Sequence, residues 1–420
     1  MAFRIAAFTA LAALSAGSAL AQHSPATPVI PAPEAPMTGP ETLVPVASNA
    51  GLQDWIDRFR SRALAQGISA GTFDRAMRGG TYIATVVEKD RRQGEFTKTI
   101  WDYLDKAVSD ERVANGKKAL RQNRRLLERI EAAYGVDKEV VVAVWGLESA
   151  YGEVMGDIPL IEALATLAYD ARRGGFFEDQ LVAALKIIQA GNVTPGRMTG
   201  SWAGAMGHTQ FIPTSYLAYA VDFTGDGKRD IWSDNPADAL ASTAAYLSRF
   251  GWAQNRPWGL EVSLPADFDA SLSGERTRKS ADDWQALGVR AADGSAIGNH
   301  GPASILLPAG ARGAAFMIFP NFNVIERYNA ADAYVIAIGH LSDRIRGGGP
   351  IRHSWPRDDR ALTLPERIEL QERLTAAGYD TGGADGKVGP RTLAAVRAFQ
   401  RAQGQIPDGY ASLDILKKLR

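Results

Sequence analysis

Apolar residues recur at helical spacing along most of the chain. In "DWIDRFRSRALAQGI", which follows shortly after Gly51, the residues Trp55, Ile56 and Phe59 fall near one face, as in an amphipathic helix. A second run, "KKALRQNRRLLERIEAAYGV", closes on Gly135, a residue typical of helix C-caps. Further helices are predicted over 159–170, 177–190, 213–221, 236–250 and 330–345.

Short alternating stretches interrupt this helical pattern within 258–320. "LEVSLPADF" and "GAAFMIF" predict strands of a small insertion. The glycine- and proline-rich segment "RGGGPIRHSWPRDD" at 346–359 then marks a domain boundary. After it, Thr363 and Glu366 stand at capping-box spacing, Gly378 ends that helix, and two shorter helices follow. The predicted fold class is mainly α (α+β), with a small β-containing insertion and a small three-helix C-terminal domain.

The first residues have the composition of an export signal. Arg4 precedes the apolar run "IAAFTALAAL", and Ala19 and Ala21 form a small-residue cleavage site. The run is too short to favour a membrane span, and the chain has no cysteine to carry a lipid anchor. Residues 22–48 are rich in proline and alanine, as in an extended linker. We expect an exported, soluble protein of the periplasm without a membrane anchor.

Charge and length limit the partners and the number of domains. The 47 basic and 47 acidic residues cancel, which argues against nucleic acid and is compatible with a neutral polymer. A chain of 420 residues exceeds one ordinary core, so two folded units are expected. The predicted segments are a signal peptide (1–21), a Pro-rich linker (22–48), a main domain (49–345), a second linker (346–362) and a C-terminal domain (363–420).

One helix combines an apolar run with a carboxylate. In "VVVAVWGLESAYGEVMG", residues 140–156, Glu148 shares a face with Val144 and Trp145, and the other faces are also apolar. Asp137 stands where an N-cap would open this helix, which is predicted to be buried all round. Desolvation and the negative end of the helix dipole would both raise the pKa of such a carboxyl group, as a general acid for glycosidic cleavage requires. Read alone, the stretch equally fits a glutamate that reaches solvent or pairs with an arginine.

Four motifs then follow one another in an order found in one family. They are "ESAYG" at 148–152, "GSWAGAMGHTQFIPTSY" at 200–216, "VDFTGDGKRDIW" at 221–232 and "PNFNVIERYN" at 320–329. Together they resemble the lytic murein transglycosylases of the B type, glycoside hydrolase family 103. The segment that begins "LQERLTAAGYDTGGADGKVG" resembles the small three-helix peptidoglycan-binding domain of bacterial wall enzymes. Both resemblances imply peptidoglycan glycan strands as the partner.

The resemblance implies a lysozyme-like catalytic domain with a single catalytic carboxylate, Glu148. It would protonate the oxygen between N-acetylmuramic acid and N-acetylglucosamine and then deprotonate the muramyl O6 hydroxyl, which attacks C1. The product would be a 1,6-anhydro sugar, formed without water and without a cofactor for catalysis. Two alternatives stay open: a muramidase-type hydrolase with a second, unrecognised carboxylate, and an inactive peptidoglycan-binding scaffold.

The resemblance also implies a groove of tyrosines, amides and guanidinium groups. Aromatic rings cover the apolar faces of sugars, amides and hydroxyls pair with sugar hydroxyls, and an arginine would hold a muramyl carboxylate. Taken singly, each tyrosine is more often a core residue, and only the motif context favours binding. The implied groove residues are Tyr103, Arg172, Arg173, Ser201, Gln210, Tyr246, Tyr328, Asn329 and Tyr334.

The stretch "DFTGDGKRDIWSDNPAD" places oxygen-bearing side chains at nearly the spacing of a calcium loop, with Gly227 at the turn. Thr224 holds the third position and Ser233 the twelfth, so the resemblance assigns the closing carboxylate to Asp238. A structural calcium ion is expected; the alternative is an Asp- and Gly-rich turn that binds no ion. The expected ligands are Asp222, Thr224, Asp226, Lys228 through its carbonyl, and Asp238.

The C-terminal domain offers no evident nucleophile or acid–base pair, so it is expected to bind the wall and raise the effective concentration of the cleft there. Other cell-wall enzymes are further expected partners, and the protein is expected to be a monomer. His208 and His340 have no matching ligands in the sequence, so no zinc site is expected.

Overall fold

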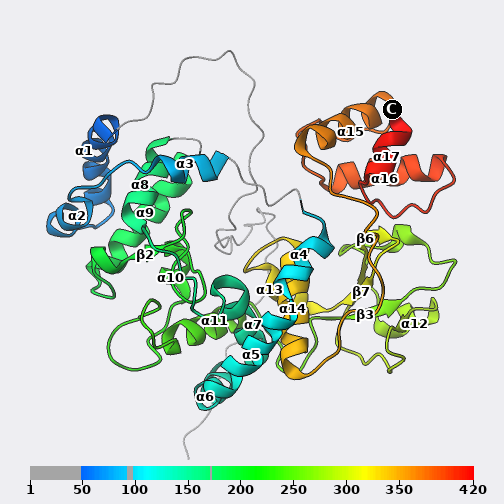
Figure 1. The fold of residues 1–420 in the computed structure, drawn as a ribbon, viewed down its shortest axis with the longest axis horizontal. Helices are drawn as coiled ribbons and strands as arrows, with labels where there is room; N and C mark the ends of the chain where they lie inside the picture. Colours follow the sequence, from blue (N-terminus) through cyan, green and yellow to red (C-terminus); the bar gives the residue numbers. More distant parts are fainter. Residues whose placement is uncertain (1–48, 92–97, 171–172) are drawn as a thin grey trace, which may run out of the picture.

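The computed structural model describes residues 49–91, 98–170 and 173–420 (Figure 1). The predicted signal peptide, the Pro-rich linker at 22–48 and Arg172 lie outside these described residues. Within them, no helix is both long and apolar enough to cross a bilayer.

Helices dominate the described chain, as predicted. They are α1 (Asn49–Ala65), α2 (Ala70–Met77), α3 (Ala84–Arg91), α4 (Ile100–Ala107), α5 (Asp110–Gln122), α6 (Arg124–Tyr134), α7 (Lys138–Ser149), α8 (Leu160–Asp170), α9 (Gly174–Gln189), α10 (Pro213–Tyr219), α11 (Ala237–Arg249), α12 (Ala281–Ala286), α13 (Pro320–Glu326), α14 (Asp332–Arg346), α15 (Leu364–Ala376), α16 (Pro390–Ala402) and α17 (Leu413–Leu419). The strands are β1 (Ile158–Pro159), β2 (Thr199–Gly200), β3 (Gly259–Ser263), β4 (Arg290–Ala291), β5 (Ser304–Leu306), β6 (Pro308–Ala311) and β7 (Ala315–Ile318).

Helix α7 runs through the main core, where it packs against α5, α6, α11 and α14 (Figure 1). Every side chain from Val140 to Trp145 is buried, which confirms the prediction of a helix buried all round. The helix ends because Ala150 and Tyr151 both adopt left-handed backbone conformations, with φ of 51° and 65°. Glu148 therefore lies in the last turn of a helix that the core holds on every side.

One local prediction about this region is wrong, and two are confirmed. The run at 117–136 is not one helix, because α5 ends at Gln122 and α6 starts at Arg124. Asp137 is the N-cap residue of α7, as predicted. Its carboxylate makes no cap hydrogen bond and instead accepts from the indole of Trp252 (2.8 Å) and from other distant groups. Gly135 ends α6 with φ of 64°, as predicted.

The predicted β-containing insertion is a four-stranded antiparallel sheet in the order β4-β3-β7-β5. Strands β3 and β7, the centre of this sheet, come from the two alternating stretches predicted as strands, and Gly259 pairs with Ile318. A separate core around Trp284 lies beneath the sheet. The sheet and α12 lie on the opposite side of α14 from α8 and α9 (Figure 1).

The C-terminal module consists of α15, α16 and α17 around its own apolar core. Thr363 and Glu366 form the predicted capping box at the start of α15. The preceding residues 347–362 contain no helix or strand, as their glycines and prolines predict, yet they pack on the rest of the protein.

Candidate active site

Glu148 is half-buried in the last turn of α7, and one of its carboxylate oxygens accepts a hydrogen bond of 2.5 Å from the hydroxyl of Tyr334 on α14. Burial raises the pKa of Tyr334 well above that of an ordinary tyrosine, and the Glu148 carboxylate adds to this effect. Tyr334 therefore stays a neutral donor that orients the carboxyl group. This places two of the predicted site residues in direct contact.

A pocket opens beside Glu148, at the junction of α7, α10, α11 and the segment after α13. Of the described residues that line this pocket, only Glu148 carries a carboxylate. Four predicted groove residues line it with Glu148: Gln210, Tyr246, Tyr328 and Asn329. The lining residues that the sequence reading missed are Ala205, Phe211, Ile212, Ser215 and Arg327.

Gln210 is held in an uncommon conformation at the pocket wall. Its φ is 54°, a left-handed value that a side chain with a Cβ rarely adopts. The side-chain amide donates hydrogen bonds to the carbonyl oxygens of Met155 (3.0 Å) and Gly207 (2.8 Å). In the described chain, three of the four non-glycine residues with positive φ are Ala150, Tyr151 and Gln210. Such strain gathers where function requires a fixed geometry.

Aromatic rings form the base of the pocket. Tyr246 and Tyr328 pack edge to face with their centroids 5.0 Å apart, and Phe211 lies against both. The Tyr328 hydroxyl donates to the carbonyl oxygen of Thr209 (2.7 Å), and the Tyr246 hydroxyl donates to that of Arg327 (2.5 Å). These hydroxyls therefore fix the loops around the pocket, and the exposed Asn329 lies at its edge, where its side-chain oxygen accepts from the N–H of Ala331.

Three predicted groove residues have other positions. The Ser201 hydroxyl accepts hydrogen bonds from the backbone N–H groups of Ala203 and Ala205 and so closes a turn. Tyr103 on α4 lies near Tyr334. Neither Ser201 nor Tyr103 belongs to the pocket lining. Arg173 pairs with Asp90 and lies over the ring of Phe177, while its Nε and Nη1 have no hydrogen-bond partner among the described residues. Its assignment to a muramyl carboxylate stays a prediction.

His208 has structural partners that the sequence did not reveal. Its Nδ1 accepts a hydrogen bond from the Trp145 indole (3.1 Å), its Nε2 lies 2.7 Å from the carbonyl oxygen of Ser233, and its own carbonyl accepts from Ser149 (2.6 Å). The Trp145 donor places the ring proton on Nε2, which donates to Ser233. Burial lowers the pKa of His208, so the ring is neutral. The last turn of α7 is thereby fastened to the 200–216 motif.

A second group of carboxylates lies near α13 and outside the lining of this pocket. Glu275 and Glu326 both accept from the Asn323 amide at 3.4 Å, and Asp332 lies close enough to interact with them. Burial, reinforced by the charges of Glu326 and Asp332, raises the pKa of Glu275 to about 7.

This raised pKa leads to a stability prediction. A carboxyl group whose folded pKa lies above its unfolded value destabilises the folded state progressively as pH rises from about 4.5 to about 7. Glu275→Gln should therefore raise the free energy of unfolding by about 1 kcal/mol at pH 8, with solvent screening allowed for, and leave it unchanged at pH 4. Urea unfolding at both pH values checks this, and an equal effect at the two pH values would refute it.

The aspartate-rich loop after α10 brings three carboxylates together. Asp222, Asp226 and Asp238 each place an oxygen within 4.8 Å of the others. Asp222 accepts from the backbone of residues 225–227, and Asp238 is buried at the start of α11, where it accepts from the N–H groups of Phe223, Thr224 and Asp230. Burial raises the pKa of Asp238. Hard oxygen donors at such spacing suit Ca²⁺.

Comparison with known proteins agrees with this geometry. A family model described as "Transglycosylase SLT domain" matches residues 51–343, and one for a peptidoglycan binding domain matches residues 363–419. The chain belongs to the transglycosylase SLT family. The resemblance stated from the motifs is confirmed, and so is the mainly helical, lysozyme-like fold class. This transglycosylase is therefore a peptidoglycan-cleaving enzyme with a peptidoglycan-binding domain.

Three relatives of the transglycosylase illustrate the match. Membrane-bound lytic murein transglycosylase B of Escherichia coli K12 is 35% identical over 247 residues, which cover 58% of this chain and 66% of the relative. SltB3 of Pseudomonas aeruginosa, solved in complex with NAG-anhNAM-pentapeptide, is 50% identical with a TM-score of 0.85, over 88% of this chain and 99% of that one. Slt35 of Escherichia coli, solved in complex with calcium, is 30% identical with a TM-score of 0.60, over 72% of this chain and 94% of that one.

Proposed function

We propose that this transglycosylase cleaves the β-1,4 bond between N-acetylmuramic acid and N-acetylglucosamine, with Glu148 acting first as acid and then as base. Protonated Glu148 donates its proton to the glycosidic oxygen as the C1–O bond breaks. The 2-acetamido oxygen of the muramyl unit stabilises the positive charge at C1. The Glu148 carboxylate then takes the proton of the O6 hydroxyl as O6 bonds to C1. Glu148 is restored, and no water is consumed.

The observation that carries this proposal is that Glu148 is the only carboxylate among the described residues of the pocket lining. A hydrolase with two catalytic carboxylates would need a second one roughly 5 to 10 Å away across the substrate. The substrate's own O6 hydroxyl makes that second group unnecessary. The bond from Tyr334 to Glu148 argues against an inactive scaffold, because it holds the carboxyl group in place.

Mass spectrometry of the soluble products from purified peptidoglycan tests the reaction. Muropeptides lighter by one water and resistant to borohydride are expected. Reducible ends would establish a hydrolase instead, and the absence of soluble products would favour the scaffold.

The proposed location of this reaction is the periplasm, reached through the signal peptide at 1–21. The supporting observations are the apolar run, the small residues before Gln22 and the extracytoplasmic position of peptidoglycan. Intact-mass measurement of protein from the periplasmic fraction should give a chain that starts at Gln22. A chain that retains Met1 in the cytoplasm would contradict this location.

The C-terminal module is proposed to hold the enzyme on the wall, and its match to the peptidoglycan-binding family supports this role. Removing residues 363–420, with the preceding segment left intact, should lower the fraction of protein that sediments with insoluble peptidoglycan. Equal sedimentation of the two forms would refute the binding role.

The three-carboxylate loop is proposed to bind calcium for stability. The cluster of Asp222, Asp226 and Asp238 fits a divalent cation, which would offset the unfavourable burial of Asp238. Slt35, which was solved in complex with calcium, supports this assignment. Thr224 and the carbonyl of Lys228 would complete the ligand set.

Calcium at 100 times its Kd should stabilise the protein by about 2.7 kcal/mol, because only the folded loop gathers the ligands. The Tm should therefore rise with calcium and fall again with EDTA. Asp226→Asn should abolish the response, whereas Asp234→Asn, at an exposed position in the same stretch, should retain it. A calcium response that survives Asp226→Asn would rule out this ligand set.

A further inference from the structure

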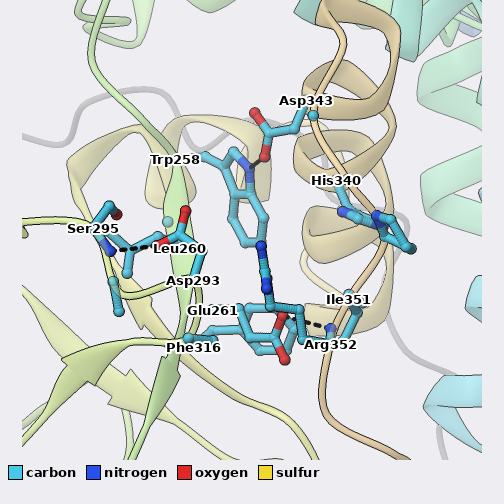
Figure 2. Close-up of a pocket in the computed structure, with 16 residues that line it drawn as sticks. Trp258, Leu260, Glu261, Asp293, Ser295, Phe316, His340, Asp343, Ile351 and Arg352 are labelled. Carbon is cyan, nitrogen blue, oxygen red and sulfur yellow. Dashed lines mark hydrogen bonds between the residues drawn. The ribbon is translucent and has the colours of Figure 1, made fainter.

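Residues 346–362 connect α14 to the C-terminal module, and we call this segment the strap. It begins beside the sheet of the insertion. The carboxylate of Glu261 on β3 accepts hydrogen bonds from the backbone N–H groups of Arg352 (2.8 Å) and His353 (2.7 Å), and His353 Nδ1 lies 2.7 Å from the same carboxylate. Figure 2 shows Ile351 and Arg352 beside Glu261 and Phe316, along one wall of a pocket below Trp258 and Asp343. Both Glu261 oxygens are therefore used to fix the strap.

The middle of the strap is packed between two elements. The ring of Trp355 lies between Trp101 on α4 and Phe316 on β7, with centroid separations of 6.4 and 6.5 Å. Gly313 leaves room for this ring, because a Cβ atom there would lie 3.2 Å from Trp355. Trp355 thus connects the sheet to α4 by apolar contact.

An ion pair reinforces the contact with α4. Arg357 donates to both carboxylate oxygens of Asp105, at 2.8 and 2.9 Å. The guanidinium holds the pKa of Asp105 below its ordinary value, so the pair is charged at neutral pH. Bidentate geometry of this kind fixes orientation as well as distance.

Helix α4 carries Tyr103 between these two attachment points. The helix packs on α14, which supplies Tyr334, the donor to Glu148. Tyr103 lies close enough to Tyr334 to contribute to the raised pKa of that residue. The strap therefore contacts a helix that packs on α14, the helix that carries Tyr334.

The far end of the strap leads into a module that is itself docked on the insertion. Asp408 accepts from the backbone N–H of Ala311 (2.8 Å), and Arg397 donates to the carbonyl and hydroxyl oxygens of Ser273 at 3.0 Å. Gly310 permits this approach, since a Cβ atom there would lie 2.5 Å from Asp408. The module is joined to the catalytic domain by contacts at both ends of the strap.

We propose that the strap is a positioning element for the reaction, in which Trp355 and Arg357 hold α4 so that Tyr103 supports the Tyr334–Glu148 pair. A glycan strand bound by the docked module then reaches Glu148 with the pair already in its reactive geometry. This proposal rests on the proposed function, because it concerns the efficiency of the same acid–base group.

Steady-state kinetics of the full-length protein on soluble, uncrosslinked peptidoglycan fragments tests the proposal. Trp355→Ala and Arg357→Ala should each lower kcat about tenfold and change KM less than twofold, because the acid is misplaced while the pocket remains. Trp355→Phe should restore most of kcat. The matched control is Arg312→Ala, which removes an exposed ion pair to Asp358 in the same strap without touching α4, and should have wild-type kcat.

The outcomes distinguish a failure of the proposed reaction from a failure of the proposed role of the strap. A wild-type protein that releases no anhydro product would overturn the proposed function. An active wild type with unchanged kcat in Trp355→Ala and Arg357→Ala would overturn the strap. A lower Tm with unchanged kcat would also overturn it, because that pattern marks a stabilising contact only. If Trp355→Ala does not fold, Arg357→Ala decides, since its ion pair lies at the surface.

Discussion

Glu148→Gln should reduce the release of anhydro-muropeptides by at least about 10³-fold, because it removes the proton that leaves with the glycosidic oxygen and the base that activates O6. Glutamine has the shape of glutamate, and its carbonyl oxygen can still accept the hydrogen bond from Tyr334. The variant should therefore fold and bind peptidoglycan as the wild type does. Initial rates of product release at saturating soluble substrate measure the effect.

A nearby glutamate provides the matched control for this prediction. Glu153 lies five residues further along the chain and is exposed beyond the end of α7. Glu153→Gln removes the same charge from the same segment and should retain wild-type activity. If Glu148→Gln kept more than a tenth of the wild-type rate, Glu148 would not be the acid, and the single-carboxylate mechanism would fail.

The parts of the site that could be predicted are those with short-range signals. The apolar run around Glu148 fixed its burial, and the left-handed residues after Ser149 end the helix within the "ESAYG" motif. The motif at 200–216 and the one at 320–329 lie more than 100 residues apart, yet Gln210 and Tyr328 line the same pocket. Their proximity was expected only because the motifs follow a family order, since periodicity alone carries no information about which loops meet.

Several side chains have partners that are distant in the sequence, which no short-range pattern reveals. Arg173, which the resemblance assigns to the substrate, also pairs with Asp90, 83 residues earlier. Asp137 has the position of an N-cap, yet its carboxylate binds Trp252, 115 residues later. His208 appeared to lack ligands because its partners are an indole and a backbone carbonyl, which leave no pattern of metal-binding residues. In each case a tertiary hydrogen bond holds the side chain.

The loop "IPDGYAS" at 406–412 of the module also has a partner that is distant in the sequence. Asp408 accepts from Ala311 of the insertion and from Gln400 and Tyr410 within the module. This loop therefore contributes to the docking of the module on the catalytic domain.

Gly152→Ala should strongly lower both stability and activity. The residue has φ of 93°, and a Cβ atom there would lie 2.6 Å from Nδ1 of His208. That ring cannot retreat without losing the bonds from Trp145 and to Ser233. We expect a loss of stability of about 2–5 kcal/mol, the sum of backbone strain and overpacking, and a rate loss of about 100-fold as the last turn of α7 shifts.

Gly251→Ala is the control that distinguishes backbone strain from overpacking against His208. Gly251 has nearly the same φ, 89°, but a Cβ atom there would meet no other atom within 4 Å. Its replacement by alanine should lower the free energy of unfolding only through backbone strain, by about 1–2 kcal/mol. The rate of product release should be unchanged. Urea unfolding and initial rates, measured where both variants are folded, provide the comparison. If the two substitutions had equal effects, the His208 ring would move aside without cost. The hydrogen bonds of His208 that connect α7 to the 200–216 motif would then not position Glu148.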